Sequence, residues 1–225
     1  ISHPEDAGMV RNAVATAGET ATRLGLASAP ASAEAMAIAR DLALVEETGA
    51  AIHFRQVTTA QGLALVRSAK ARGLRVTCGI TPAHLFLSDL AMSEFRTFAR
   101  LSPPLRSEAD RQACLEAVSD GTIDVLCSAH DPRGPEAKRL PFADAEPGMA
   151  GAETLLALGL GLVRDGLIDL PRLIAMVSAN PARIIGVEGG SLAPGAAADV
   201  ILFDPDAPWI IDGSRFSGQA GNTPF

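Results

Sequence analysis

A group of polar residues comes directly after a short apolar run near the middle of the sequence. The apolar run spans Ile123–Cys127, and Ser128–Gly134 (SAHDPRG) follows it. A buried parallel strand has this apolar pattern, and α/β proteins place their chemistry at the carboxyl ends of such strands. In the polar group, His130 is a potential metal ligand and Asp131 is a carboxylate that can move a proton, on a loop turned by proline and glycine. The alternative is a strand followed by an ordinary polar turn, and this segment alone does not decide between the two.

The chain has four histidines, and each lies in or just after a predicted strand: His3, His53, His84 and His130. A single histidine in such a place is usually a core or turn residue, which is how we interpret His53 and His84. Imidazoles and carboxylates from different strand ends are also the ligands that zinc prefers. The four histidines together therefore leave a structural role and a metal or acid–base site both open.

Composition and charge narrow the class of protein. The chain has 225 residues, 48% of them hydrophobic, and a formal net charge of −7 with no basic run. This balance argues against a nucleic-acid surface and suits helices packed on a buried sheet. The longest apolar stretch, Leu155–Val163, is too short to cross a bilayer. The three cysteines are far apart, which favours reduced thiols in a cytoplasmic protein. Because the sequence begins at Ile1 and not at Met, we expect its natural start to lie upstream.

Turn and cap residues divide the chain into alternating strands and helices. Strands are predicted at Ala51–Thr58, Leu74–Thr81 and Ile123–Ser128, after a strand tail at Ile1, and helices at Ala33–Thr48, Ala60–Arg72, Ser107–Ser119, Ala150–Arg164 and Pro171–Val177. This order indicates a right-handed parallel α/β arrangement. About four barrel-type strands are visible, whereas a closed (β/α)₈ barrel needs eight. The chain is therefore either an open sheet or the later half of a barrel, and a strand at Ala198–Asp204 indicates a small separate β-structure.

Several segments resemble dihydroorotases of the amidohydrolase superfamily. They include Leu101–Ser107 (LSPPLRS), Asp120–Asp124 (DGTID) and Lys138–Thr154 (KRLPFADAEPGMAGAET), and the resemblance covers nearly the whole chain. It implies an α/β fold in which residues 1–190 form the later part of a (β/α)₈ TIM-like barrel. Residues 191–225 would add strands to a small β-sandwich domain. The family's His-x-His metal pair and its bridging lysine or aspartate would then precede Ile1.

The family reaction is the reversible cyclisation of N-carbamoyl-L-aspartate to dihydroorotate in pyrimidine biosynthesis. It needs a metal that polarises the amide carbonyl, a carboxylate that moves a proton and groups that hold the substrate carboxylate. The resemblance implies that His3 and His130 bind the metal and that Asp131 transfers the proton. It also implies that the substrate is bound by Ser102, Arg133, Pro147 and Gly148.

Some positions depart from the family pattern. Gln56 stands where the family has a metal-binding histidine, and glutamine is a poor zinc ligand. In Ala129–Arg133 (AHDPR), the aspartate stands two places later than in the family's DHAPH. Arg133, which replaces a histidine, still fits a forked contact with a carboxylate. We therefore expect one zinc ion, with its remaining ligands upstream of Ile1, and we interpret Arg106 as part of an ion pair within the fold.

The resemblance favours an active dihydroorotase in which Asp131 or His130 takes the vacated position. The alternative is a catalytically inactive dihydroorotase-like partner of aspartate transcarbamoylase, because loss of the base costs orders of magnitude in rate. Another cyclic-amide hydrolase, of hydantoinase or allantoinase type, fits less well because Pro103–Ser107 (PPLRS) favours dihydroorotase. We expect a cytoplasmic homodimer that acts on a small molecule and binds neither nucleic acid nor membrane.

Overall fold

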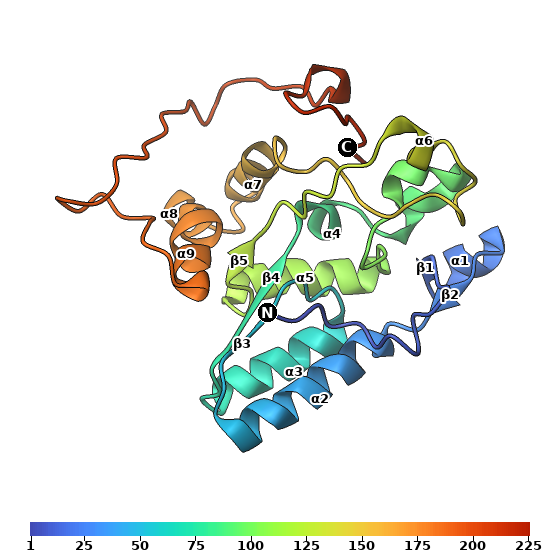
Figure 1. Ribbon diagram of the computed structural model, residues 1–225, viewed down its shortest axis with the longest axis horizontal. Coiled ribbons are helices and arrows are strands. Elements are labelled where there is room, and N and C mark those ends of the chain that lie inside the picture. Colours follow the sequence, from blue (N-terminus) through green and yellow to red (C-terminus); the bar gives the residue numbers. More distant parts are fainter.

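Three parallel strands form the centre of the molecule. The structure is a computed structural model that describes residues Ile1–Phe225. The strands β3 (Ile52–Phe54), β4 (Val76–Ile80) and β5 (Val125–Leu126) lie in the order β3-β4-β5 (Figure 1). Ser2 adds a parallel bridge to Phe54 on the outer side of β3, so the predicted strand tail at the start of the chain is confirmed. The parallel α/β arrangement is confirmed as well, although each strand is shorter than its apolar pattern.

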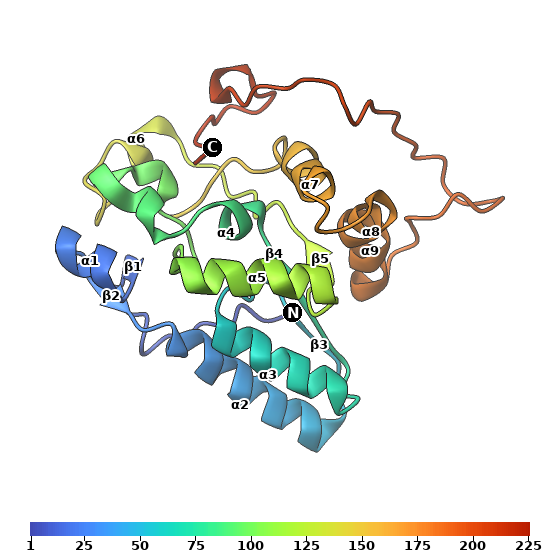
Figure 2. The same ribbon diagram turned by 180° about the vertical axis from the view of Figure 1, so that it is seen from behind.

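Three long helices lie side by side along the sheet. α3 (Ala60–Ala71) runs between α2 (Ser32–Thr48) and α5 (Glu108–Asp120), as Figures 1 and 2 show from opposite sides. Their ends lie within one residue of the predicted bounds. The Thr59 hydroxyl caps α3 by accepting from the backbone N–H of Gly62, and Gly49 ends α2 in the left-handed region at φ 66°.

The remaining elements are shorter. They are β1 (Ala15–Thr16), α1 (Glu19–Leu24), β2 (Ser28–Ala29), α4 (Pro82–Phe86), α6 (Pro135–Lys138), α7 (Leu155–Arg164), α8 (Leu170–Ile174) and α9 (Asn180–Ile185), with 3-10 segments at Asp89–Phe95, Thr97–Ala99 and Gly213–Arg215 and a π-helical turn at Ala175–Ala179. The helix predicted at Pro171–Val177 is thus divided between α8 and the π-helical turn. None of the helices has the length and apolar character of a membrane span.

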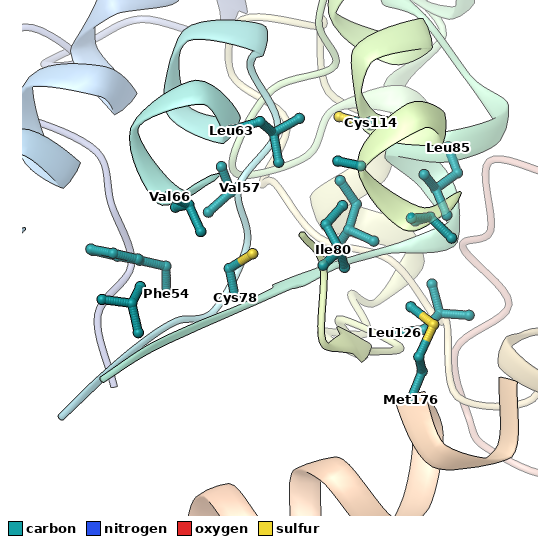
Figure 3. Close-up of a cluster of buried hydrophobic side chains, with 14 of the residues drawn as sticks. Phe54, Val57, Leu63, Val66, Cys78, Ile80, Leu85, Cys114, Leu126 and Met176 are labelled. Atoms are coloured by element: carbon teal, nitrogen blue, oxygen red, sulfur yellow. The ribbon is translucent and has the colours of Figure 1, made fainter. Parts of the chain in front are cut away.

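The main hydrophobic core joins the sheet to the helices. Phe54 of β3, Ile80 of β4 and Leu126 of β5 are buried together with side chains from α3, α4, α5 and the π-helical turn (Figure 3). Burial of these apolar side chains supplies the main driving force for folding. Cys78 and Cys114 lie in this core as free thiols, and burial raises the pKa of Cys78 to about 12.

The segment after α9 differs from its prediction. Ala198–Asp204 forms no strand, and Ile201 and Leu202 are 73% and 100% exposed. A strand needs a neighbour to pair with its backbone N–H and C=O groups, and no other strand of the chain lies beside this segment. Residues 191–225 were expected only to add strands to a β-sandwich built from both ends of the complete protein, and that domain stays a prediction. The chain then returns to the main body, where Asn222 and Thr223 are buried (Figure 1).

Candidate active site

A cavity of about 530 Å³ lies where the three central strands end. Arg55 and Gln56 follow β3, Thr81 follows β4, and the loop from Cys127 to Asp131 follows β5. The full lining comprises Arg55, Gln56, Thr81, His84, Leu101, Ser102, Cys127, Ser128, Ala129, His130, Asp131, Gly148 and Met149. A concave, mostly polar site at the carboxyl edge of a parallel sheet is the usual place for ligand binding in α/β proteins.

The loop after β5 is held against residues 147–149. The backbone N–H of Asp131 donates to the Met149 carbonyl at 2.8 Å. The Asp131 side chain is 57% exposed, and its Oδ2 accepts from Arg133 Nη2 at 2.7 Å. Arg133 Nε also donates to the Pro147 carbonyl at 2.8 Å. At the mouth of the cavity, this loop therefore presents a carboxylate that is already paired with a cation.

Gly148 allows the close approach of these two segments. Its φ is 131°, and a Cβ at this position would lie 2.4 Å from the carbonyl oxygen of Asp131. Only glycine adopts this backbone conformation without strain and leaves room for the neighbouring carbonyl. The expected helix at Ala150–Arg164 begins instead at Leu155, because the N–H of Ala150 donates to the Asn222 carbonyl and the N–H of Ala152 donates to His130 Nδ1.

His3 has both ring nitrogens in polar contacts, and His130 has one. His130 Nδ1 accepts from the backbone N–H of Ala152 at 3.2 Å, which places the proton of the neutral ring on Nε2. His3 Nε2 lies 3.1 Å from Glu5 Oε2, and its Nδ1 lies 3.4 Å from Arg55 Nη2. Neither ring, as it stands, presents a free lone pair to the cavity.

The donor set of this chain does not fit a zinc ion by itself. No three side chains among its histidines, cysteines, aspartates and glutamates are grouped so as to hold a metal. The resemblance places Gln56 at the position of one metal ligand, and a carboxamide oxygen is a weak ligand for zinc. A zinc site would need ligands from outside these residues and a new hydrogen-bond arrangement at His3 or His130.

A buried polar network lies behind the cavity. The Glu34 carboxylate, from α2, is fully buried and accepts from the backbone N–H and the hydroxyl of both Thr58 and Thr59. Arg106, 4% exposed, lies 3.4 Å from the same carboxylate and donates to the hydroxyls of Thr58 and Thr16. The predicted structural role of Arg106 is confirmed, and the network fixes the loop that carries Arg55 and Gln56.

Two further titratable groups border this network. His84 is buried between the Thr81 hydroxyl and the Pro103 carbonyl, and burial lowers its pKa to about 4. The predicted structural role of His84 is therefore confirmed. Burial raises the pKa of Glu5, but the hydrogen bond with His3 and the charge of Arg106 together bring it below its ordinary value.

The structure brings part of the predicted set together. Ser102, His130, Asp131 and Gly148 line one cavity, whereas Arg133, Pro147 and His3 do not line it, and His3 contacts Arg55. Sequence reasoning did not select Arg55, and it treated Gln56 only as a poor metal ligand. Their position directly after an apolar strand is the signal that identifies both as candidates.

The comparisons with known proteins agree with this arrangement. The amidohydrolase family matches residues 3–223. The chain is 45% identical over 221 residues to the dihydroorotase-like protein of Pseudomonas aeruginosa and 42% identical over 225 residues to a dihydroorotase of Syntrophus aciditrophicus. These matches cover 98% and 100% of the chain but 52% and 53% of the two relatives.

A solved structure from the same class of enzymes is similar to this chain in fold. The L-hydantoinase (dihydropyrimidinase) of Arthrobacter aurescens aligns with a TM-score of 0.71 at 30% identity, over 76% of this chain and 40% of that enzyme. The chain belongs to the amidohydrolase family. It spans about half the length of the curated relatives that it matches, among which dihydroorotases predominate.

Proposed function

We propose that the complete protein containing this chain is a dihydroorotase, a cyclic amidohydrolase that interconverts N-carbamoyl-L-aspartate and dihydroorotate. The observation that carries the proposal is the identity of 39–45% to dihydroorotases and a dihydroorotase-like protein along the whole chain. It is supported by a cavity of suitable size for a small dicarboxylate at the edge where family members place their chemistry.

In this proposal the loop after β5 moves the proton. Asp131 takes the proton from the ureido nitrogen during ring closure and returns it during hydrolysis. The carboxylate can leave Arg133, because an ion pair this exposed is worth about 0–1 kcal/mol. A substrate carboxylate that binds the Arg133 guanidinium would release Asp131 for this role.

The other proposed contacts follow the cavity wall. Ser102 and Gly148 line the cavity, and Pro147 lies just outside it. In this proposal Ser102 offers its hydroxyl to the substrate, and Pro147 and Gly148 offer carbonyl oxygens that each already accept one hydrogen bond. The single zinc ion expected from the sequence, with His3 and His130 among its ligands, stays a prediction. A family metal polarises the amide carbonyl, and metal analysis of the complete protein tests whether one ion is held.

A second candidate function is favoured by the state of Asp131. Its carboxylate points to Arg133 and is more than half exposed, and Ala129 stands at the family's aspartate position. The second candidate function is that of a catalytically inactive dihydroorotase-like partner of aspartate transcarbamoylase. Structural neighbours named hydantoinase keep the broader cyclic-amide class as a third possibility. For a dihydroorotase or another cyclic-amide hydrolase, we propose a homodimer in the cytoplasm.

One assay separates these candidates. The complete protein is purified alone and with aspartate transcarbamoylase, and its rate is measured with dihydroorotate, hydantoin and allantoin. A dihydroorotase turns over only the first. An inactive partner turns over none, and co-elutes with the transcarbamoylase on size exclusion. Turnover of hydantoin or allantoin in preference to dihydroorotate would overturn the proposed substrate.

A further inference from the structure

Gln56 is buried beside the cavity with an unsatisfied acceptor. The residue is 2% exposed, it lines the cavity, and its Oε1 has no hydrogen-bond partner. A buried carbonyl oxygen without a donor is costly, so native proteins rarely keep one unless it serves a ligand or another function. The surrounding cavity provides the space from which such a donor can come.

The backbone on both sides of Gln56 is held in place. The N–H of Val57 donates to the Gly79 carbonyl at 2.9 Å, and a Cβ on Gly79 would lie 2.8 Å from the Arg55 carbonyl oxygen. On the far side, the Glu34 carboxylate binds the backbone of Thr58. The chain on both sides of Gln56 is therefore fixed by the sheet and by the buried network. A group held this way is preorganised and has little freedom to find another partner.

A cation stands next to it. Arg55 lines the same cavity and is exposed, and no carboxylate lies within ion-pair distance of its guanidinium. Its nearest polar neighbour is His3 Nδ1, at 3.4 Å. An arginine in this state can bind a ligand carboxylate by two parallel N–H···O bonds.

We infer that Gln56 and Arg55 together recognise an anionic ureide or cyclic amide. Gln56 Oε1 accepts a hydrogen bond from a ligand N–H, and the Arg55 guanidinium binds a ligand carboxylate. Where the family pattern has a metal-binding histidine, this chain has a residue that selects the ligand by hydrogen bonding. The inference rests on the proposed function for its substrate class, but it does not require turnover.

The test compares two ligands on the complete protein. N-carbamoyl-L-aspartate carries two carboxylates and ureido N–H groups, whereas succinate carries two carboxylates and no N–H. Isothermal titration calorimetry measures both ligands on the wild type, Gln56→Met, Arg55→Gln and the control Gln61→Met, which changes an exposed glutamine of α3. The loss of one hydrogen bond predicts that Gln56→Met weakens carbamoyl aspartate about three- to tenfold and leaves succinate within twofold.

The other variants complete the pattern. Arg55→Gln should weaken both ligands by a similar factor, and Gln61→Met should change neither. Gln56→Met should leave the melting temperature unchanged or raise it, because it removes an unsatisfied buried oxygen. Equal weakening of both ligands by Gln56→Met, no weakening of either, or a marked fall in melting temperature would each overturn the role of Gln56.

Turnover is measured separately from ligand binding. A protein that shows the ligand split but forms no dihydroorotate contradicts the proposed activity and supports the inference. A protein that turns over dihydroorotate while Gln56→Met binds carbamoyl aspartate like the wild type supports the activity and contradicts the inference.

Discussion

Two carboxylate–guanidinium pairs in this molecule are built from the same chemical groups and differ in surroundings. Glu34 and Arg106 lie 3.4 Å apart with side chains 0% and 4% exposed, and four further donors satisfy the carboxylate. Asp131 and Arg133 lie closer, at 2.7 Å, but are 57% and 30% exposed. The shorter contact is the weaker one, because water screens it and replaces it at little cost.

The difference in burial gives the two ion pairs different roles. The buried pair has no role that water or a ligand can take over, so it fixes the loop between β3 (Ile52–Phe54) and α3 (Ala60–Ala71). The exposed pair can open when a ligand carboxylate competes for the guanidinium. A rigid frame behind a site and an exchangeable contact at its mouth are the arrangement expected of a binding site.

The largest effect is predicted for the buried pair. Glu34→Ala removes the acceptor for both threonines and leaves the buried Arg106 guanidinium with Glu5, 3.5 Å away, as its remaining carboxylate partner, which should cost about 3–5 kcal/mol of unfolding free energy. Urea unfolding of the complete protein measures it. Asp131→Asn is the matched control and should cost less than about 1 kcal/mol. Similar losses in the two variants would show that burial does not distinguish the pairs.

A smaller loss is predicted for Gly148→Ala. The new Cβ would meet the Asp131 carbonyl, and alanine is strained at φ 131°, so the variant should lose about 1–3 kcal/mol and displace the loop that carries Asp131 and Arg133. Gly134→Ala is the control, because Gly134 has φ −65° and nothing within 4 Å of a Cβ. Thermal unfolding compares the two variants. An unchanged melting temperature in Gly148→Ala would mean that the two segments separate easily.

A pH effect of comparable size is expected from His84. Its pKa is about 4 in the folded protein and about 6.5 in the unfolded chain, so only the unfolded state takes up a proton between these values. Stability should therefore fall as the pH is lowered from about 6.5 towards 4, by at most about 1.4 kcal/mol per pH unit. Unfolding at pH 7 and pH 5 measures this loss in the wild type and in His84→Gln. The same loss in both proteins would assign it to other groups.

Local signals in the sequence predicted much of the fold. Gly49 and Ser107 marked helix ends that the structure places within a residue or two, because caps and left-handed glycines act over a few residues. The strand at Ala198–Asp204 was wrong, because pairing depends on a second strand that its own residues do not encode. Its apolar pattern alone was not enough.

The candidate site was predictable to a lesser degree. The residues after Ile123–Cys127 were identified because a strand and a turn flank them. Glu34 gave no signal, since a glutamate in the first turn of a helix is usually exposed, and only the tertiary fold buries it. Ring orientations at His3 and His130 were equally invisible, because they depend in part on Arg55 and Ala152, which are distant in sequence.

We propose that the cavity after the three strands carries out dihydroorotase chemistry in the complete protein, with Asp131 as the proton carrier. The most direct measurement is the initial rate of dihydroorotate formation from N-carbamoyl-L-aspartate by the complete protein, as wild type and as Asp131→Asn. We predict turnover in the wild type and a loss of about 10²–10⁴-fold in the variant, with unchanged unfolding. No turnover in the wild type, or a normal rate in Asp131→Asn, would contradict the claim.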